Sequence, residues 1–253
     1  MTDTPIQSGE IFQAWDLYAR IVHENWMKHR EMQQAIQAAV SEAMRSQPAI
    51  PLRILDLGCG DGTMAFRGLA DADVESYAGI DLSQDALSQC AARSGPGRRH
   101  AVNKWLHRGD LAETLSQWPQ HDVDVVLASY SLHHFATDAK SAILADISRV
   151  LRPGGRFLWI DIVRAPEESR DAFLDRIERE IREQWSTMPE AEQQAAVEHI
   201  RECDFPESEA WMVDQWRSMH GGRMHSNAMQ EGFMQRLVHD PLYGCWCMRK
   251  ETA

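Results

Sequence analysis

A glycine-rich turn beside two carboxylates is the first group of residues with the types and spacing to do chemistry. It runs Asp56-Leu57-Gly58-Cys59-Gly60-Asp61-Gly62 and follows a short apolar run. Glycines let the backbone turn tightly and approach a ligand without a Cβ clash. Asp81 ends the next apolar run, 21 residues after Gly60, where a carboxylate can accept hydrogen bonds from two ribose hydroxyls. The pattern predicts a nucleotide site.

The carboxylates around this turn distinguish two kinds of nucleotide ligand. A dinucleotide requires a third glycine three positions after the second and no negative charge close to its pyrophosphate. Asp56 precedes the turn and Asp61 lies within it. Such charges suit a cation, and S-adenosylmethionine carries a sulfonium and an ammonium group without a phosphate. We therefore expect S-adenosylmethionine as the cofactor, with S-adenosylhomocysteine as its product, and not NAD.

The elements that would position this turn follow from the periodicity of apolar residues. From about residue 52 to 163, short apolar runs alternate with helical stretches, which predicts a parallel sheet covered by helices on both faces. Runs near residues 233–238 and 244–248 predict an antiparallel hairpin at the sheet edge. The expected fold class is α/β, a doubly wound, seven-stranded, mostly parallel sheet of Rossmann-like type with an antiparallel C-terminal hairpin.

Two helical regions flank this sheet in the sequence. Residues 9–46 show helical spacing and predict two N-terminal helices, and residues 165–222 predict a helical insertion after the fifth strand. We divide the chain into an N-terminal helical lid, residues 1–48, and one domain, residues 49–253. Within that domain, the insertion is expected to cap the substrate.

Five motifs, in order, resemble those of the class I S-adenosylmethionine-dependent methyltransferases of small-molecule type. They cover roughly residues 53–163 and comprise the glycine turn, Gly79-Ile80-Asp81-Leu82-Ser83, Gly109-Asp110-Leu111, the Asp124–Ser129 run with Leu132-His133-His134-Phe135, and Leu151-Arg152-Pro153-Gly154-Gly155-Arg156-Phe157. The later Glu231-Gly232-Phe233 resembles the start of the family's closing hairpin. The resemblance implies methyl transfer from S-adenosylmethionine.

The same resemblance implies which residues hold the cofactor. Asp81 would grip the ribose hydroxyls, Leu82 would pack on the adenine, and Asp110 would accept from the adenine amino group. Leu111 would donate through its backbone, and Ser129 would offer its carbonyl to the ammonium. The other expected contacts are Asp56, which orders the loop, Gly58 and Gly60 under the methionine part, Cys59, Gly109, His134, and Arg30 at the methionine carboxylate.

Catalytic and acceptor-binding residues are expected after the fourth strand, in the lid and in the insertion. Methyl transfer needs a base only if the nucleophile arrives protonated. His133 and His134 lie at the sheet edge where ligands bind and, with Tyr18 of the lid, are the candidate catalytic residues. Candidate substrate contacts are Trp26, His29, Trp185 and Trp211. The alternatives are loop packing for the histidines and core packing for the tryptophans.

Charge bears on the kind of acceptor. Lys plus Arg number 26 and Asp plus Glu 38, a net charge of −12. Because nucleic-acid affinity rests largely on basic residues, we expect a small-molecule acceptor methylated at O, N or S. Two alternatives stay open: methylation of tRNA or another nucleic acid, suggested by the basic stretch from Arg93 to Arg108, and a non-catalytic S-adenosylmethionine-binding module.

Cysteine spacing and hydropathy bear on metals and location. The five cysteines are scattered and do not have the spacing of zinc ligands, so no metal is expected. No apolar run approaches the roughly 18 residues of a membrane span. We expect a cytoplasmic protein without a membrane partner, as a monomer or homodimer.

Overall fold

One mixed sheet organises the molecule, and the computed structural model describes it through residues 17–46, 50–98, 102–219 and 234–251. The strand order is β3-β2-β1-β4-β5-β8-β7, with β1 to β5 parallel and β8 antiparallel to both of its neighbours. The strands are β1 (Leu52–Leu57), β2 (Val74–Asp81), β3 (Asn103–Arg108), β4 (Val123–Ser129), β5 (Leu151–Arg164), β7 (Met234–His239) and β8 (Tyr243–Arg249).

The central strands are apolar on both sides because helices cover both faces of the sheet. Every residue of β4 except Ser129 is buried, as is nearly all of β1. The helices are α2 (His29–Ser46), α3 (Thr63–Gly68), α4 (Gln84–Ala92), α5 (Leu111–Ser116), η1 (Leu132–His134), α6 (Thr137–Val150), α7 (Arg170–Gln184), α8 (Glu190–Cys203) and α9 (Glu209–Met219). The predicted doubly wound sheet and closing hairpin are confirmed.

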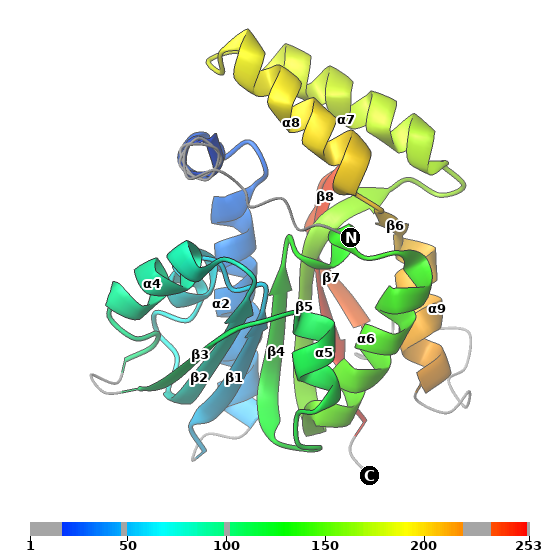
Figure 1. Cartoon of the computed structure of the whole chain (residues 1–253). Helices are drawn as coiled ribbons and strands as arrows, with labels where there is room; N and C mark the ends of the chain where they lie inside the picture. The colour runs from blue at the N-terminus through cyan, green and yellow to red at the C-terminus, as the bar shows by residue number, and fades with distance from the viewer. Residues whose placement is uncertain (1–16, 47–49, 99–101, 220–233, 252–253) are drawn as a thin grey trace, which may run out of the picture.

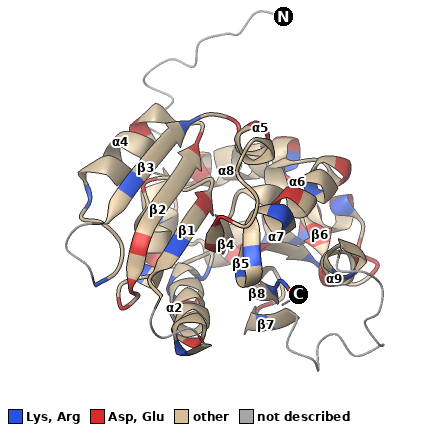
Figure 2. Cartoon of the chain, turned by 90° about the horizontal axis from the view of Figure 1, so that it is seen from below, with Lys and Arg blue, Asp and Glu red and all other residues tan. Residues whose placement is uncertain are grey.

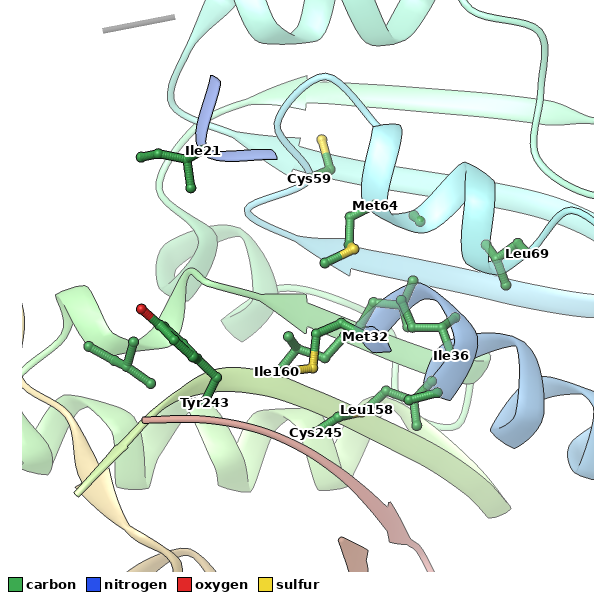
Figure 3. Close-up of a cluster of buried hydrophobic side chains, with 14 of the residues drawn as sticks. Ile21, Met32, Ile36, Cys59, Met64, Leu69, Leu158, Ile160, Tyr243 and Cys245 are labelled. Carbon is green, nitrogen blue, oxygen red and sulfur yellow. The ribbon is translucent and has the colours of Figure 1, made fainter. Parts of the chain in front are cut away.

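Helix α2 is a core helix of the sheet domain, which corrects its placement in a separate lid. Its apolar stripe packs on one face of the sheet, where Met32 and Ile36 are fully buried. Figure 3 shows these two side chains lying between Leu69 and Met64 of the α3 region and Leu158 and Ile160 of β5. Among the described residues of the predicted lid, 17–28 are therefore the ones placed to act as a lid.

The chain before α2 forms a separate short helix, because the predicted N-terminal helical pattern is interrupted. Residues 17–24 are helical, and a turn at residues 25–27 precedes α2. Asn25 and Lys28 have φ values of 62° and 59°, in the left-handed region that an α-helix cannot contain. The break resets the helical phase, so residues on its two sides do not share one face.

The predicted insertion divides into two parts with different positions. Helices α7 and α8 form a hairpin beyond the carboxyl ends of the parallel strands, which we call the cap (Figure 1). After α8 the chain forms the short strand β6 (Glu207–Ser208), which pairs with the end of β5. Helix α9 then packs with α6 on the opposite face of the sheet from α2. Only α7 and α8 therefore belong to the cap.

Buried ion pairs fix the segment that links the cap to α9. The side chain of Lys140 is fully buried and donates to the Phe205 carbonyl and to Glu207 Oε1, the latter at 3.0 Å. Arg164 also contacts Glu207, at 3.4 Å. Because each buried charge has a partner, the segment from residue 204 to 207 is held against α6 and the end of β5.

Parts of three predicted features lie outside the described residues. These are residues 1–16 of the predicted lid, residues 220–222 of the predicted insertion and the Glu231-Gly232-Phe233 motif. Within the described ranges, no helix is both long and apolar enough to cross a membrane.

Candidate active site

The glycine turn is shaped by its own carboxylates and by left-handed backbone. Gly58, Gly60 and Gly62 have φ values of 72°, 53° and 76°, which L side chains rarely adopt. Asp81 Oδ2 accepts from the Gly60 N–H at 2.7 Å, and its Oδ1 accepts from the Ser83 N–H at 2.8 Å. A Cβ on Gly60 would meet no atom within 4 Å. The turn is thus open on the side where a ligand would approach.

Asp56 lies beneath the turn and is buried at the end of β1. Its Oδ2 accepts from the Tyr77 hydroxyl at 2.7 Å. Burial raises the pKa of Asp56 to about 7, partly opposed by the Tyr77 hydrogen bond and reinforced by the charge of Asp81. A cationic ligand above the turn would favour the ionised form of Asp56.

The other residues of the turn are engaged within the protein. Cys59 is buried, and its amide donates to the Ile80 carbonyl at 3.0 Å. Asp61 accepts from the Thr63 N–H at 2.9 Å and forms an ion pair with Arg93. These contacts attach the turn to β2 and to the end of α4.

The predicted adenine end of the site lies at the carboxyl ends of β2 and β3. Leu82 is 69% exposed, unusually for a leucine between a strand and a helix. Asp110 caps α5, where its Oδ1 accepts from the Glu113 N–H at 2.9 Å, and the adjoining Leu111 is buried. The Gly109 N–H donates to the Asp81 carbonyl at 3.1 Å. An exposed apolar side chain here offers a surface on which an adenine ring could pack.

The loop after β4 joins this turn to a cavity under the cap. Ser129 ends β4, and Ser131 Oγ donates to the Leu57 carbonyl at 2.7 Å. A Cβ on Gly58 would lie only 2.5 Å from Ser131 Cβ, so the two loops touch. Tyr130, His133 and His134 of this segment form part of the cavity wall.

The cavity has a volume of about 780 Å³ and lies between residues 17–27, the cap and the loop after β4. Its apolar lining includes Leu17, Ile21, Met27, Ile162, Ile177, Trp185 and Ile200. Its polar lining is Tyr18, Arg20, Tyr130, His133, His134, Glu192, His199, Asp204 and Tyr243. Pockets of roughly 300–1,000 Å³ with a few converging polar groups are typical of small-molecule sites.

His133 is the best-anchored polar residue in this wall. Its Nδ1 and its backbone N–H both contact the buried Asp161, which also accepts from Trp159 Nε1 at 3.0 Å. Burial opposes protonation of His133, but Asp161 and Asp204 outweigh it and raise its pKa. His134 follows with a side chain 41% exposed, and its Nδ1 lies 3.3 Å from Asp204 Oδ1. The structure brings both predicted histidines to the cavity.

Tyr18 and His29 form an aromatic group beside Tyr130. The rings of Tyr18 and His29 are 6.0 Å apart, and those of His29 and Tyr130 are 5.2 Å apart. Tyr18 is 37% exposed, but desolvation at the cavity wall and the carboxylates of Asp61, Asp56 and Asp81 raise its pKa, so its phenol stays protonated and can donate. His29 is buried, and neither ring nitrogen has a hydrogen-bond partner among the described residues.

Three predicted contacts are placed elsewhere by the structure. Arg30 is exposed and donates to the His23 carbonyl at 2.8 Å, so its side chain contacts the interhelical turn. Trp211 belongs to α9 and packs against Trp159, on the face of the sheet opposite the cavity. Trp26 stacks on Trp185 at 5.1 Å and 6° but is not part of the cavity lining, whereas Trp185 is.

The sequence did not point to two residues of the cavity lining, His199 and Asp204, or to Asp161, which holds His133 from behind the cavity wall. Asp161 stands among apolar residues in β5, where an acid is unusual. His199 and Asp204 carry no local signal, since only the return of α8 to the sheet edge brings them near His134.

The basic stretch from Arg93 to Arg108 is engaged in internal contacts. Arg93 pairs with Asp61, and Lys104 Nζ donates to three carbonyls, those of Cys90, Ala91 and Arg93. Arg108 Nε donates to the Leu82 carbonyl at 3.2 Å. In Figure 2, segments of Lys and Arg alternate with segments of Asp and Glu instead of gathering on one element. These side chains position the turn and the neighbouring strand ends.

Comparisons with known proteins agree with this geometry. Residues 54–155 match the family model described as a methyltransferase domain. The 27-O-demethylrifamycin SV methyltransferase of Amycolatopsis mediterranei is 27% identical over 222 residues, covering 82% of this chain and 78% of the relative. The uncharacterised methyltransferase YcgJ of Bacillus subtilis is 27% identical over 170 residues, covering 63% of this chain and slightly less than two thirds, 64%, of that relative.

A solved structure supports the fold over nearly the whole chain. The plantazolicin methyltransferase BpumL in complex with SAH has a TM-score of 0.60 at 13% identity, and the alignment covers 93% of this chain and 90% of that one. At this identity the likeness concerns the fold, including the sheet edge at which the glycine turn and the cavity meet.

Proposed function

Since the chain belongs to the class I S-adenosylmethionine-dependent methyltransferases, we propose that it transfers the methyl group of this cofactor to a small-molecule acceptor held under the cap. The observation that carries the proposal is the cavity of about 780 Å³, which is separated from the glycine turn by a single loop. The loop touches the turn at Gly58 and Ser131 and supplies His133 and His134 to the cavity.

The residues around the glycine turn fit the cofactor. Bound S-adenosylmethionine supplies an electrophilic methyl group on a sulfonium. Asp81 is positioned for the ribose hydroxyls, exposed Leu82 for the adenine, and open Gly60 for close backbone approach. Asp56, Asp61 and Asp81 favour a ligand with positive charge. We include Asp110, Leu111 and Ser129 in the proposed cofactor site, at the ends of β3 and β4.

The lining of the cavity suggests the chemistry of the acceptor. Trp185 and the aliphatic side chains suit an acceptor with an apolar or aromatic part. Tyr18, His133 and His134 converge from different elements and suit a protic group at the reacting atom, which would be O, N or S. His134 is half exposed and lies nearest to solvent, so we propose it as the residue that receives a proton.

Nucleic acid is disfavoured as the acceptor. The basic residues from Arg93 to Arg108 that motivated this alternative are largely occupied by internal hydrogen bonds and ion pairs. A nucleic-acid substrate needs free cations that replace counterions along a phosphate backbone. The proposal keeps a cytoplasmic location and a monomeric or homodimeric state, the latter measurable by light scattering.

Blocking the cavity without touching the glycine turn tests the proposal. Ala195 lines the cavity from α8, so Ala195→Trp should fill part of it. We expect normal affinity for S-adenosylhomocysteine in calorimetry and at least a tenfold loss of methyl transfer to a panel of small acceptors. Glu183→Trp places the same ring on the exposed outside of α7 and should leave transfer unchanged.

Two outcomes would contradict the proposal. Transfer to tRNA that survives Ala195→Trp would move the acceptor site out of the cavity. Failure of the unmodified protein to bind S-adenosylhomocysteine would remove the cofactor assignment.

A further inference from the structure

Three potential metal ligands converge on the cavity wall next to the proposed transfer site. His133 Nε2 lies 3.6 Å and His134 Nδ1 lies 3.3 Å from Asp204 Oδ1, and the three atoms are all within 4.8 Å of one another. Asp204 is 4% exposed, yet its Oδ1 has no hydrogen-bond partner among the described residues. A buried carboxylate oxygen without a donor is costly, so this arrangement favours a positive group between the three side chains.

The spacing suits a metal ion better than a shared proton. Hydrogen bonds between nitrogen and oxygen span about 2.7–3.2 Å, which is shorter than either separation from Asp204. Two ligand atoms that are each about 2.0–2.1 Å from a tetrahedral ion lie about 3.3–3.4 Å apart. The 3.3 Å separation matches an edge of such a ligand set, and the 3.6 Å separation is slightly longer than one.

The tautomer of His133 also suits metal binding. Asp161 can only accept, so Nδ1 of His133 carries the proton that it donates to this carboxylate. The remaining nitrogen, Nε2, faces Asp204 and the cavity, and a metal ion would displace any proton on it and bind its lone pair. Metal-binding histidines commonly donate their other N–H to a carboxylate, which fixes the ring and increases its basicity.

The third ligand is held as firmly as the first. The Phe205 N–H donates to the His133 carbonyl at 2.6 Å, and Arg170 Nε donates to the Asp204 carbonyl at 2.7 Å. Buried Lys140 binds the Phe205 carbonyl and Glu207. The chain around Asp204 is thus fixed to η1, α6 and α7, so the ligand set is already assembled.

We propose that His133, His134 and Asp204 bind one divalent first-row transition ion of the zinc type, with an open coordination position facing the cavity. Two imidazoles and one carboxylate with a free position are the usual ligands of catalytic zinc and related ions. This departs from the expectation of a metal-free protein, which considered the cysteines and not two histidines joined by an aspartate about seventy residues later in the sequence.

The role of the ion rests on the proposed function, whereas its binding does not. A hydroxyl or thiol of the acceptor at the open position would lose its proton to solvent more readily, because a bound divalent ion lowers the pKa of its ligand. With the ion bound, His134 would be a ligand, and this role would replace the proton-accepting role proposed for it above. The site would therefore select acceptors whose nucleophile is an oxygen or sulfur that can ligate a metal, and disfavour tertiary amines.

Cobalt binding to the full chain tests the site without the cofactor or an acceptor. The protein is treated with a chelator and then titrated with Co²⁺, and its visible absorption and affinity are measured. We expect one ion per chain with the absorption of a low-coordinate Co²⁺ centre. Asp204→Asn and the half-exposed His134→Ala should each weaken binding at least tenfold. His239→Ala, at an exposed position in β7, is the matched control and should not change it.

Each result separates the ion from the proposed function. No stoichiometric Co²⁺ uptake, or equal uptake by the His134→Ala and Asp204→Asn variants, would overturn the metal site. If S-adenosylhomocysteine still binds in calorimetry, the methyltransferase proposal stands without the ion. Stoichiometric Co²⁺ binding without S-adenosylhomocysteine binding would support the metal site and contradict the methyltransferase proposal.

Discussion

The two halves of the active site are built in opposite ways. The proposed cofactor half comes from residues 56–62 and from the ends of β2, β3 and β4, all within residues 56–129, and Asp81 bonds the glycine turn directly. The acceptor half takes Tyr18, His133, Asp204 and Tyr243 from segments spread over most of the chain. Local sequence therefore encodes the cofactor half, while the acceptor half exists only when the cap, the sheet and the N-terminal helix are assembled.

The largest expected effect concerns the contact between Gly58 and Ser131, where the glycine turn meets the loop after β4. Gly58→Ala places a Cβ 2.5 Å from Ser131 Cβ at a φ of 72°, so both loops must shift. We expect the free energy of unfolding in urea to fall by about 3–4 kcal/mol.

Gly60→Ala is the matched control for Gly58→Ala. Its Cβ would meet no protein atom within 4 Å, so we expect a loss of only about 1 kcal/mol of stability, from backbone strain. It should instead weaken S-adenosylhomocysteine binding. Equal losses of stability in Gly58→Ala and Gly60→Ala would show that the close contact between Gly58 and Ser131 does not contribute to stability.

The next prediction concerns the pH dependence of folding stability, which we expect to arise from His29 in the aromatic group of the acceptor half. Burial lowers the pKa of His29 from 6.5 to about 4, partly opposed by Glu31. Folded protein keeps His29 neutral while unfolded chain takes a proton, so stability is full above pH 6.5 and lost as pH falls towards 4. The shift corresponds to about 3 kcal/mol.

Urea unfolding at pH 7.5 and 4.5 checks this prediction. His29→Phe keeps an aromatic ring between Tyr18 and Tyr130 but cannot titrate, so it should flatten the loss of stability. A variant that loses as much stability on acidification as the unmodified protein would assign the effect to other groups.

A smaller effect is expected in the cofactor half. Asp81→Ala removes the acceptor of the Gly60 N–H and the proposed ribose ligand. We expect S-adenosylhomocysteine to bind about 1.5–3 kcal/mol more weakly in calorimetry, the scale of charge-assisted hydrogen bonds. Asp85→Ala removes an exposed acid four residues later and should leave the affinity unchanged. Unchanged affinity in Asp81→Ala would place the ribose elsewhere.

The smallest expected effect concerns Arg30, which lies at the edge of the acceptor half. Arg30 is exposed and bonded to the His23 carbonyl, so Arg30→Ala should change S-adenosylhomocysteine affinity by less than about 0.5 kcal/mol. A larger loss in calorimetry would restore Arg30 to the cofactor site, and a circular-dichroism spectrum would confirm that helix content is retained.

The sequence made the cofactor half predictable because its signals are local. The positive φ values of Gly58, Gly60 and Gly62 explain why glycines stand there, and the spacing to Asp81 follows from two neighbouring parallel strands. Alternation of apolar runs and helices predicted the doubly wound parallel sheet in the same way, since connections between parallel strands are long and right-handed.

The acceptor half was predicted less well for two physical reasons. The helical spacing of residues 9–46 put both Arg30 and Tyr18 in the lid, but left-handed Asn25 and Lys28 interrupt the helix between them. The two-residue strand β6 is too short to leave a pattern, yet it carries the chain back onto the sheet. Because the sequence gives no sign of β6, the whole insertion, including Trp211, was predicted to form the cap, and Asp204 was not predicted as a site residue.

The position of β8 gives the active site an order of assembly during translation. β8 is the last described strand to leave the ribosome, and it inserts between β5 and β7 instead of adding at an edge. Its first residue, Tyr243, lines the cavity. Strands β1 to β4 and the glycine turn can pair while β8 is still being synthesised, whereas β5 keeps an open edge until then. A nascent chain would thus acquire its cofactor half first and complete its acceptor half last.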